Sequence, residues 1–71
     1  MKTFSEGDAV KWSWGNGTAT GKVVKVYTRK TTLTIKGSEI TRNATKDEPA
    51  YRIAQDDGDE VLKSITEIEA A

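Results

Sequence analysis

The chain has 71 residues, of which 35% are hydrophobic and 31% are charged, and its eleven Lys and Arg balance eleven Asp and Glu. This length allows one small domain around one core, with few large side chains to spare from packing. The chain contains no Cys and no His, which excludes disulfides, thiolate nucleophiles, the usual zinc ligands and the commonest acid–base side chain. Metal or hydrolytic sites made of carboxylates alone remain open.

An alternating apolar and polar pattern over residues 10–14, Val-Lys-Trp-Ser-Trp, predicts a half-buried strand. Gly7-Asp8 before it is a turn signal. Gly15-Asn16-Gly17 after it supplies residues that tolerate positive φ, which a hairpin connection requires. We therefore predict a first strand that leads directly into a hairpin.

The next segment, residues 20–30, is dense in β-branched and aromatic side chains and predicts a long second strand. Val24 and Val26 fall on one face of this strand, and Val23 and Tyr27 fall on the other. Such a switch of faces indicates a strand that bends near Gly21 or the valine pair and serves two sides of a barrel.

Two more hairpins are predicted further along the chain. Residues 32–35 are expected to turn and return as a strand over residues 39–42. Residues 51–55 alternate again, Asp57-Gly58 is a strong hairpin signal, and residues 60–63 form the return strand.

The segments outside these strands are short. Residues 43–49 are expected to be an irregular loop that ends at Pro49. Ser64 and Glu67 have capping-box spacing, which predicts a short helical or 3₁₀ turn near the C-terminus. No segment shows ten residues of helical periodicity. We therefore predict an all-β fold in a single domain over residues 1–71, with about five to six strands.

Several motifs resemble those of known β-barrels. Three groups, in this order and spacing, resemble the skeleton shared by Tudor, Agenet and KOW-type SH3-like barrels: Phe4-x-x-Gly7-Asp8-x-Val10-x-Trp12, then Gly21-Lys22-Val23-Val24, then Tyr51-Arg52-Ile53 followed by Asp57-Gly58 and Val61-Leu62-Lys63-Ser64. Six segments resemble a narrower family, the hypervirulence-associated Tudor-like domain: 10–15, 21–23, 36–37, 41–44, 49–51 and 62–64. The resemblance implies a small SH3-like (Tudor-type) barrel, and because that family is largely of unknown function, it implies a fold rather than a ligand.

Aromatic side chains are the first candidate binding residues, because a Tudor barrel can use aromatics near its hairpin loops to hold methylated ammonium groups. Trp14 lies beside the predicted loop at residues 15–17. It could join Tyr51 and a nearby acid, Asp56 or Asp57, at a ligand-binding site.

Burial in the core is the alternative for these aromatics. Alternation puts Val10, Trp12 and Trp14 on one strand face, and a domain this small needs its large side chains for packing. We expect Phe4, Trp12 and Tyr27 in the core and Trp14 at the surface.

Basic residues form the second candidate site, a phosphate-binding surface made of Lys22, Lys25, Arg29, Lys30 and Arg42. Residues 1–46 carry nine Lys and Arg against three Asp and Glu, whereas residues 47–71 carry two against eight. The spacing of the basic residues is uneven, so they cannot all lie on one face of a flat strand. The alternative is a solvated strand edge, on which lysine discourages edge-to-edge aggregation.

Two further motifs are interpreted as turns. The glycines at positions 15, 17 and 21 resemble a dinucleotide loop, but that chemistry needs a helix to follow, and here a strand is predicted. The acidic run 56–60 lacks the ligand spacing of a calcium loop.

The sequence therefore predicts a binding module that recognises a peptide or protein through its barrel loops. The alternative is a module that binds nucleic acid or a nucleotide phosphate through the basic region. We expect no enzyme activity, catalytic residue, metal or cofactor, because no nucleophile–base pair can be identified. Since no apolar run exceeds two residues, we expect a cytoplasmic protein without a membrane partner, and a monomer.

Overall fold

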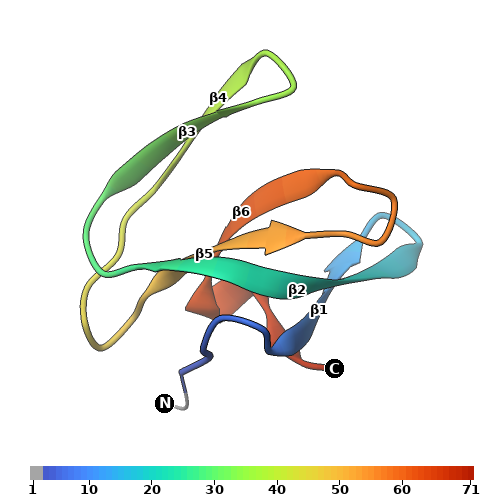
Figure 1. Ribbon diagram of the computed structural model, residues 1–71, viewed down its shortest axis with the longest axis horizontal. Helices are drawn as coiled ribbons and strands as arrows, with labels where there is room; N and C mark the ends of the chain where they lie inside the picture. Colours follow the sequence, from blue (N-terminus) through green and yellow to red (C-terminus); the bar gives the residue numbers. More distant parts are fainter. Residues whose placement is uncertain (1–2) are drawn as a thin grey trace.

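Seven strands and one 3₁₀ turn form in the part of the chain that the computed structural model describes, residues 3–71 (Figure 1). In chain order they are β1 (Ala9–Trp14), β2 (Gly17–Tyr27), β3 (Thr31–Ile35), β4 (Ser38–Arg42), β5 (Ala50–Ala54), β6 (Glu60–Ser64), η1 (Ile65–Glu67) and β7 (Glu69–Ala70). Five strands form one antiparallel sheet in the order β6-β5-β2-β1-β7, and β3 and β4 form a separate hairpin. The predicted all-β fold is confirmed, with the two-residue β7 as an added strand.

Tight turns set the register between neighbouring strands. Trp14 pairs with Gly17, so two residues join β1 to β2, and the first of them, Gly15, has a φ of 47°. Two residues, Lys36 and Gly37, also join β3 to β4, with φ values of 52° and 78°. Positive φ in such loops matches the right-handed twist of the strands that they connect.

β2 bends where the sequence predicts a bend. Its pairing with β5 shifts between Val23 and Lys25, which makes Val24 the extra residue of a β-bulge. Gly21 lets β2 approach β5 closely, because a Cβ at this position would lie 2.6 Å from the carbonyl oxygen of Ala54. The bulge increases the local twist and so helps to curl the sheet into a barrel.

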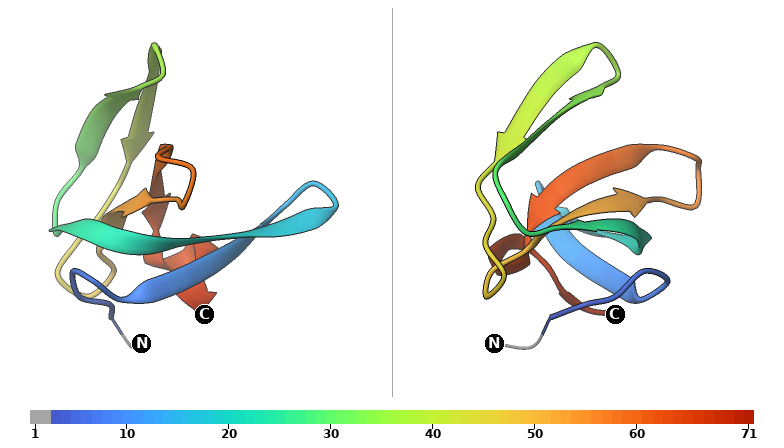
Figure 2. Two further views of the ribbon diagram at one scale, coloured as in Figure 1. Left: turned by 45° about the vertical axis from the view of Figure 1, so that its right-hand side comes forward. Right: turned by 60° about the vertical axis from the view of Figure 1, so that its left-hand side comes forward.

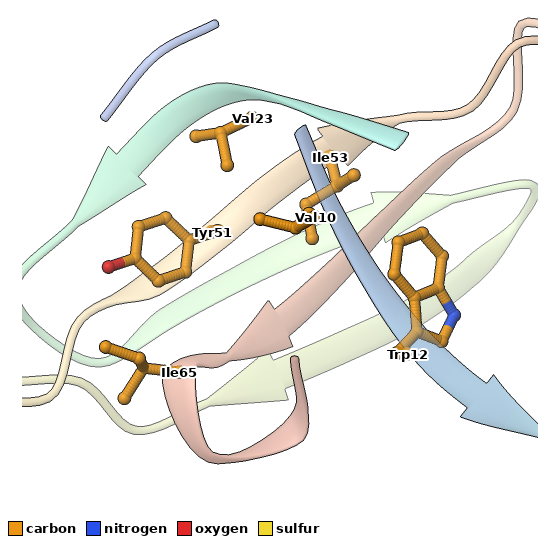
Figure 3. Close-up of a cluster of buried hydrophobic side chains, with 6 residues drawn as sticks. All are labelled: Val10, Trp12, Val23, Tyr51, Ile53 and Ile65. Carbon is orange, nitrogen blue, oxygen red and sulfur yellow. The ribbon is translucent and has the colours of Figure 1, made fainter. Parts of the chain in front are cut away.

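The core lies on one face of this sheet, where side chains from β1, β2, β5 and η1 converge (Figure 3). Each of these side chains is at most 5% exposed: Val10, Trp12, Val23, Tyr51, Ile53 and Ile65. The hydroxyl oxygen of Tyr51 accepts a hydrogen bond from the Phe4 backbone N–H at 3.0 Å, and the two rings meet edge to face. The phenol is therefore satisfied inside the core, and the segment before β1 is tied to the barrel.

The β3–β4 hairpin contacts the sheet at β6, on the face opposite the core (Figures 1 and 2). Leu62 pairs with Arg52, on the face opposite the core residue Ile53, and yet it is only 1% exposed. Ala50, on the same face as Arg52, is fully buried. Three apolar residues of the hairpin are half-buried: Leu33, Ile35 and Ile40. The hairpin therefore adds a second, smaller apolar layer over β6.

Two ion pairs join this hairpin to the rest of the molecule. Lys36 Nζ lies 2.7 Å from Asp59 Oδ2 at the hairpin tip, and Arg42 Nε lies 2.7 Å from Glu67 Oε1 at its base. Exposed ion pairs contribute about 0–1 kcal/mol each. A fully buried leucine contributes about 1.5–3 kcal/mol, so the apolar layer holds the hairpin more firmly than its charges do.

The C-terminal segment closes the barrel. The Ser64 backbone N–H donates a hydrogen bond to Glu67 Oε1 at 2.8 Å, which caps η1 as the sequence spacing predicts. Ile65 is buried and Ile68 packs against the core. After η1, β7 pairs antiparallel with β1.

Candidate functional site

Trp14 is the most exposed large apolar side chain in residues 3–71, with 63% of its surface accessible. It lies on the same strand face as the buried Trp12, but two residues further along β1, where the β1–β2 hairpin extends beyond the other strands (Figure 2). A Cβ at Gly17 would lie 3.9 Å from three atoms of the indole, so the ring lies along the turn. The structure thus places Trp14 at the surface, as the sequence predicts.

The backbone of β1 is open next to Trp14. β7 pairs with β1 at Val10 and Lys11, so Ser13 lies beyond the end of that ladder. The two-residue turn makes Trp14 a hydrogen-bonded partner of β2, and bonding alternates along antiparallel strands. The N–H and C=O of Ser13 therefore point away from β2, towards the side on which β7 lies.

A depression of about 310 Å³ follows this edge of β1. It is lined by Lys11, Trp12, Ser13 and residues 66–69. We refer to Trp14, the Ser13 backbone and this depression together as the β1-edge surface. It combines an apolar side chain, free backbone hydrogen-bonding groups and a concave wall.

The other two candidates for this ligand-binding site lie elsewhere. Tyr51 is fully buried in β5, and its hydroxyl is used by Phe4, so the expectation that it forms an exposed anchor with Trp14 does not match its position. Asp57 lies in the β5–β6 turn, where its Oδ1 accepts a hydrogen bond from the Asp59 backbone N–H at 2.9 Å. The carboxylate of Asp57 therefore serves the turn itself.

Two of the predicted phosphate ligands, Lys22 and Lys25, lie on one face of β2, and two more lie in the loop after it. Four are exposed along β2 and the loop after it: Lys22, Lys25, Arg29 and Lys30. Val23 faces the core, so Lys22 lies on the outer face of β2, and the bulge at Val24 turns Lys25 to the same face. The bulge thus compensates for the uneven spacing, which excluded a shared face only for a flat strand. We refer to these four residues as the β2 basic face.

An aromatic ring lies within this basic surface. Lys25 Nζ is 5.6 Å from the centre of the Tyr27 ring, within the range of a cation–π interaction. A shallow depression of about 390 Å³ is lined by residues 25–29. Tyr27 is half-buried on the face opposite the core, so the expectation that it lies in the core is wrong, and its ring is only partly occupied by packing.

Arg42, the fifth predicted phosphate ligand, is bound instead by Glu67. Its Nε and Nη2 lie 2.7 Å and 3.4 Å from the two carboxylate oxygens. Burial raises the pKa of Glu67, but the hydrogen bonds from Arg42 and the Ser64 N–H and the charges of Arg42 and Lys63 outweigh it, so the pKa lies below its ordinary value. Arg42 therefore holds the base of the hairpin and stands apart from the β2 basic face.

Two other cations are also held by acids. Arg52 Nε donates a hydrogen bond to Glu60 Oε1 at 3.0 Å, and this bond and the charge of Glu60 raise the pKa of Arg52. The hydrogen bond from Lys36 to Asp59, with the charge of Asp59, raises the pKa of Lys36.

The pairing of Arg52 with Glu60 and the open edge at Ser13 were not predicted from the sequence. Arg52 lies opposite Lys25 across β2 and β5, so Glu60 offsets the repulsion between these two neighbouring cations. Both features depend on which residues pair across strands and on how far each ladder extends. The period-2 pattern of one strand carries neither piece of information.

Within residues 3–71, no group of three or more acidic side chains is arranged to hold a metal ion. None of the helical segments in this range is long and apolar enough to cross a bilayer.

Five antiparallel strands around one core, with a 3₁₀ turn before the last strand, define a small β-barrel of the Tudor-like class. Residues 7–68 match the family described as "Hypervirulence associated proteins TUDOR domain", and the chain belongs to this family. Comparisons with curated proteins and with solved structures found no significant match. A Tudor-type domain is typically a binding module, and membership of this family suggests such a role here.

Proposed function

We propose that this domain is a non-catalytic module that recognises an extended peptide segment of a partner protein at the β1-edge surface. The observation that carries the proposal is the 63% exposure of Trp14 at the end of an otherwise buried row of apolar side chains on β1. Tryptophan is enriched among the residues that dominate binding energy at interfaces. Because Trp14 is exposed on so small a domain, its side chain is available as an apolar anchor for a partner.

The open backbone beside Trp14 defines how the peptide would bind. An extended segment placed along the line of β7 can pair with the N–H and C=O of Ser13, as in other cases of recognition by strand addition. Alternate side chains of that segment then face Trp14. We infer that the peptide carries an apolar residue at this position and an extended, β-compatible sequence around it.

The contribution of Trp14 can be calculated from its exposure. A tryptophan buries about 150–250 Å² when fully packed, and 63% of such a side chain is available to a partner. At about 25 cal/mol per Å² this corresponds to about 2–4 kcal/mol. Trp14→Ala should therefore weaken peptide binding about 30- to 1,000-fold.

The test begins with a display library of random 12-residue peptides selected on the wild-type domain. The selected peptide should bind Trp14→Ala much more weakly, while the circular dichroism spectrum of the variant stays that of the wild type. Val24→Ala is the matched control, because within residues 3–71 Val24 is the other exposed large apolar residue, at 42%, and lies on β2. If no peptide is selected, or if the selected peptide binds Trp14→Ala as tightly as the wild type, the proposal is wrong.

Backbone pairing has its own test at Ser13. Ser13→Pro removes an N–H that faces the open edge, and proline is tolerated where the strand N–H faces solvent. We expect weaker peptide binding with the sheet intact. Ser13→Ala keeps the N–H and should bind as the wild type does, and equal binding by both variants would exclude strand addition.

A further inference from the structure

The β2 basic face gathers four basic residues that have no acid partner, and Lys11 and Lys46 are the other two such residues within residues 3–71. Ion pairs hold four cations in the described part of the chain: Lys36, Arg42, Arg52 and Lys63. Lys22, Lys25, Arg29 and Lys30 form none within residues 3–71, and all four are exposed. Residues 9–38 contain no Asp or Glu at all. The chain has no formal net charge and yet keeps a run of unpaired positive charge along β2 and the loop after it.

The residues that pair with Lys22 and Lys25 across neighbouring strands add no free positive charge to the β2 basic face. Lys22 pairs with Ala9 on one side and with Ala54 on the other, and neither side chain carries charge. Lys25 lies opposite Arg52, which Glu60 already holds. Free positive charge is therefore concentrated on β2 and the loop that follows it, and the other unpaired cations within residues 3–71 are the half-buried Lys11 on β1 and the exposed Lys46 between β4 and β5.

From this arrangement we propose that the β2 basic face binds the phosphate backbone of single-stranded nucleic acid. A single line of cations follows one phosphate chain, whereas a duplex presents two chains on either side of a groove about 12 Å wide. Neighbouring strands lie about 4.8 Å apart, and the residues that pair directly with Lys22 on both of them are alanines.

Apolar groups within the line favour the same ligand. Val24 is 42% exposed between Lys22 and Lys25, and the Tyr27 ring lies beside the Lys25 ammonium. Single-strand binders combine a basic track with aromatic side chains on which bases stack. A base that leaves the stack of its own strand can contact Tyr27, which a paired base in a duplex cannot do.

The number of charges fixes the salt dependence. Four phosphate contacts on a single strand give a slope of about −2.8 in a plot of log K against log salt concentration. Affinity should then fall about 50-fold between 50 mM and 200 mM salt. Each charge removed should lower the affinity at 50 mM salt about eightfold and make the slope shallower by about 0.7.

The experiment is a fluorescence-anisotropy titration of a labelled 12-nucleotide single strand with the 71-residue protein. Lys22→Gln/Lys25→Gln should weaken binding about 60-fold at 50 mM salt and reduce the slope by about half. Lys36→Gln is the matched control, because it removes the same charge from a residue that Asp59 already neutralises, and it should bind as the wild type does. Circular dichroism checks that each variant stays folded.

Three results would overturn this inference: no binding of the single strand at 50 mM salt, equal loss of affinity in the Lys36→Gln control, or a duplex of the same sequence that binds at least as tightly. Inorganic polyphosphate is the third probe, after the single strand and the duplex. Equal affinity for it would identify a general polyanion site and contradict the role of Tyr27 and Val24. The inference is independent of the peptide proposal, since Trp14→Ala should leave oligonucleotide binding unchanged.

Discussion

The close approach of β2 to β5 at Gly21 makes a quantitative prediction about stability. In Gly21→Ala, the new Cβ would lie 2.6 Å from both the Ala54 carbonyl oxygen and Ile53 Cγ2. The first of these is backbone and the second belongs to a fully buried side chain, so neither can move away freely. Overpacking of this kind costs about 1–3 kcal/mol, which exceeds the roughly 0.4–1 kcal/mol gained by restricting the unfolded chain.

Gly17→Ala is the matched control, because it makes the same chemical change in the same strand. A Cβ at Gly17 would meet the Trp14 ring at 3.9 Å, an ordinary contact, so this variant should be as stable as the wild type or slightly more stable. Thermal unfolding followed by the fluorescence of the buried Trp12 should show Gly21→Ala melting roughly 5–20 °C below the wild type. If the two alanine variants unfold at the same temperature, the described packing of β2 on β5 is wrong.

Other regions of the fold are tested by two further predictions. Leu62→Ala should lower the free energy of unfolding by about 2–5 kcal/mol in urea titrations, because Leu62 is 1% exposed beneath the hairpin. A loss under about 0.5 kcal/mol would mean that the hairpin does not cover Leu62. Glu67 has a lowered pKa in the folded state, so its stabilising effect is present above the ordinary value of 4.5 and is lost as the pH falls through the lowered pKa. The wild type should therefore be more stable than Glu67→Gln at pH 7. Urea titrations between pH 7 and pH 2 should show this difference in stability shrinking below about pH 4.5. A difference that stays constant with pH would exclude the ion pair with Arg42 as the source of the stabilisation.

Much of the fold could be predicted because each strand carries its own signal. The period-2 alternation around Trp12 and Ile53 places one side chain in every two on the core face, and Gly15 and Gly58 mark turns that need positive φ. The change of face along β2 indicated the bulge now seen at Val24. These are local properties, and a single sequence contains them.

The candidate site was harder to predict because it depends on pairing between distant segments. Tyr51 and Trp14 are both aromatic residues close to predicted turns, yet one is fully buried and the other is 63% exposed. The difference arises because β5 is central in the sheet, whereas Trp14 lies past the end of β7. Arg42 likewise looks free in the sequence, and only the fold brings Glu67 to it from 25 residues away.

The central claim is that a partner peptide binds along the open edge of β1 beside Trp14. Its most direct test is an NMR titration of the ¹⁵N-labelled domain with the selected 12-residue peptide. The account predicts that amide shifts change at Ser13, Trp14 and residues 66–69, and that signals from the β3–β4 hairpin stay where they are. Shift changes confined to the hairpin or to β2, with none at Ser13 and Trp14, would contradict it.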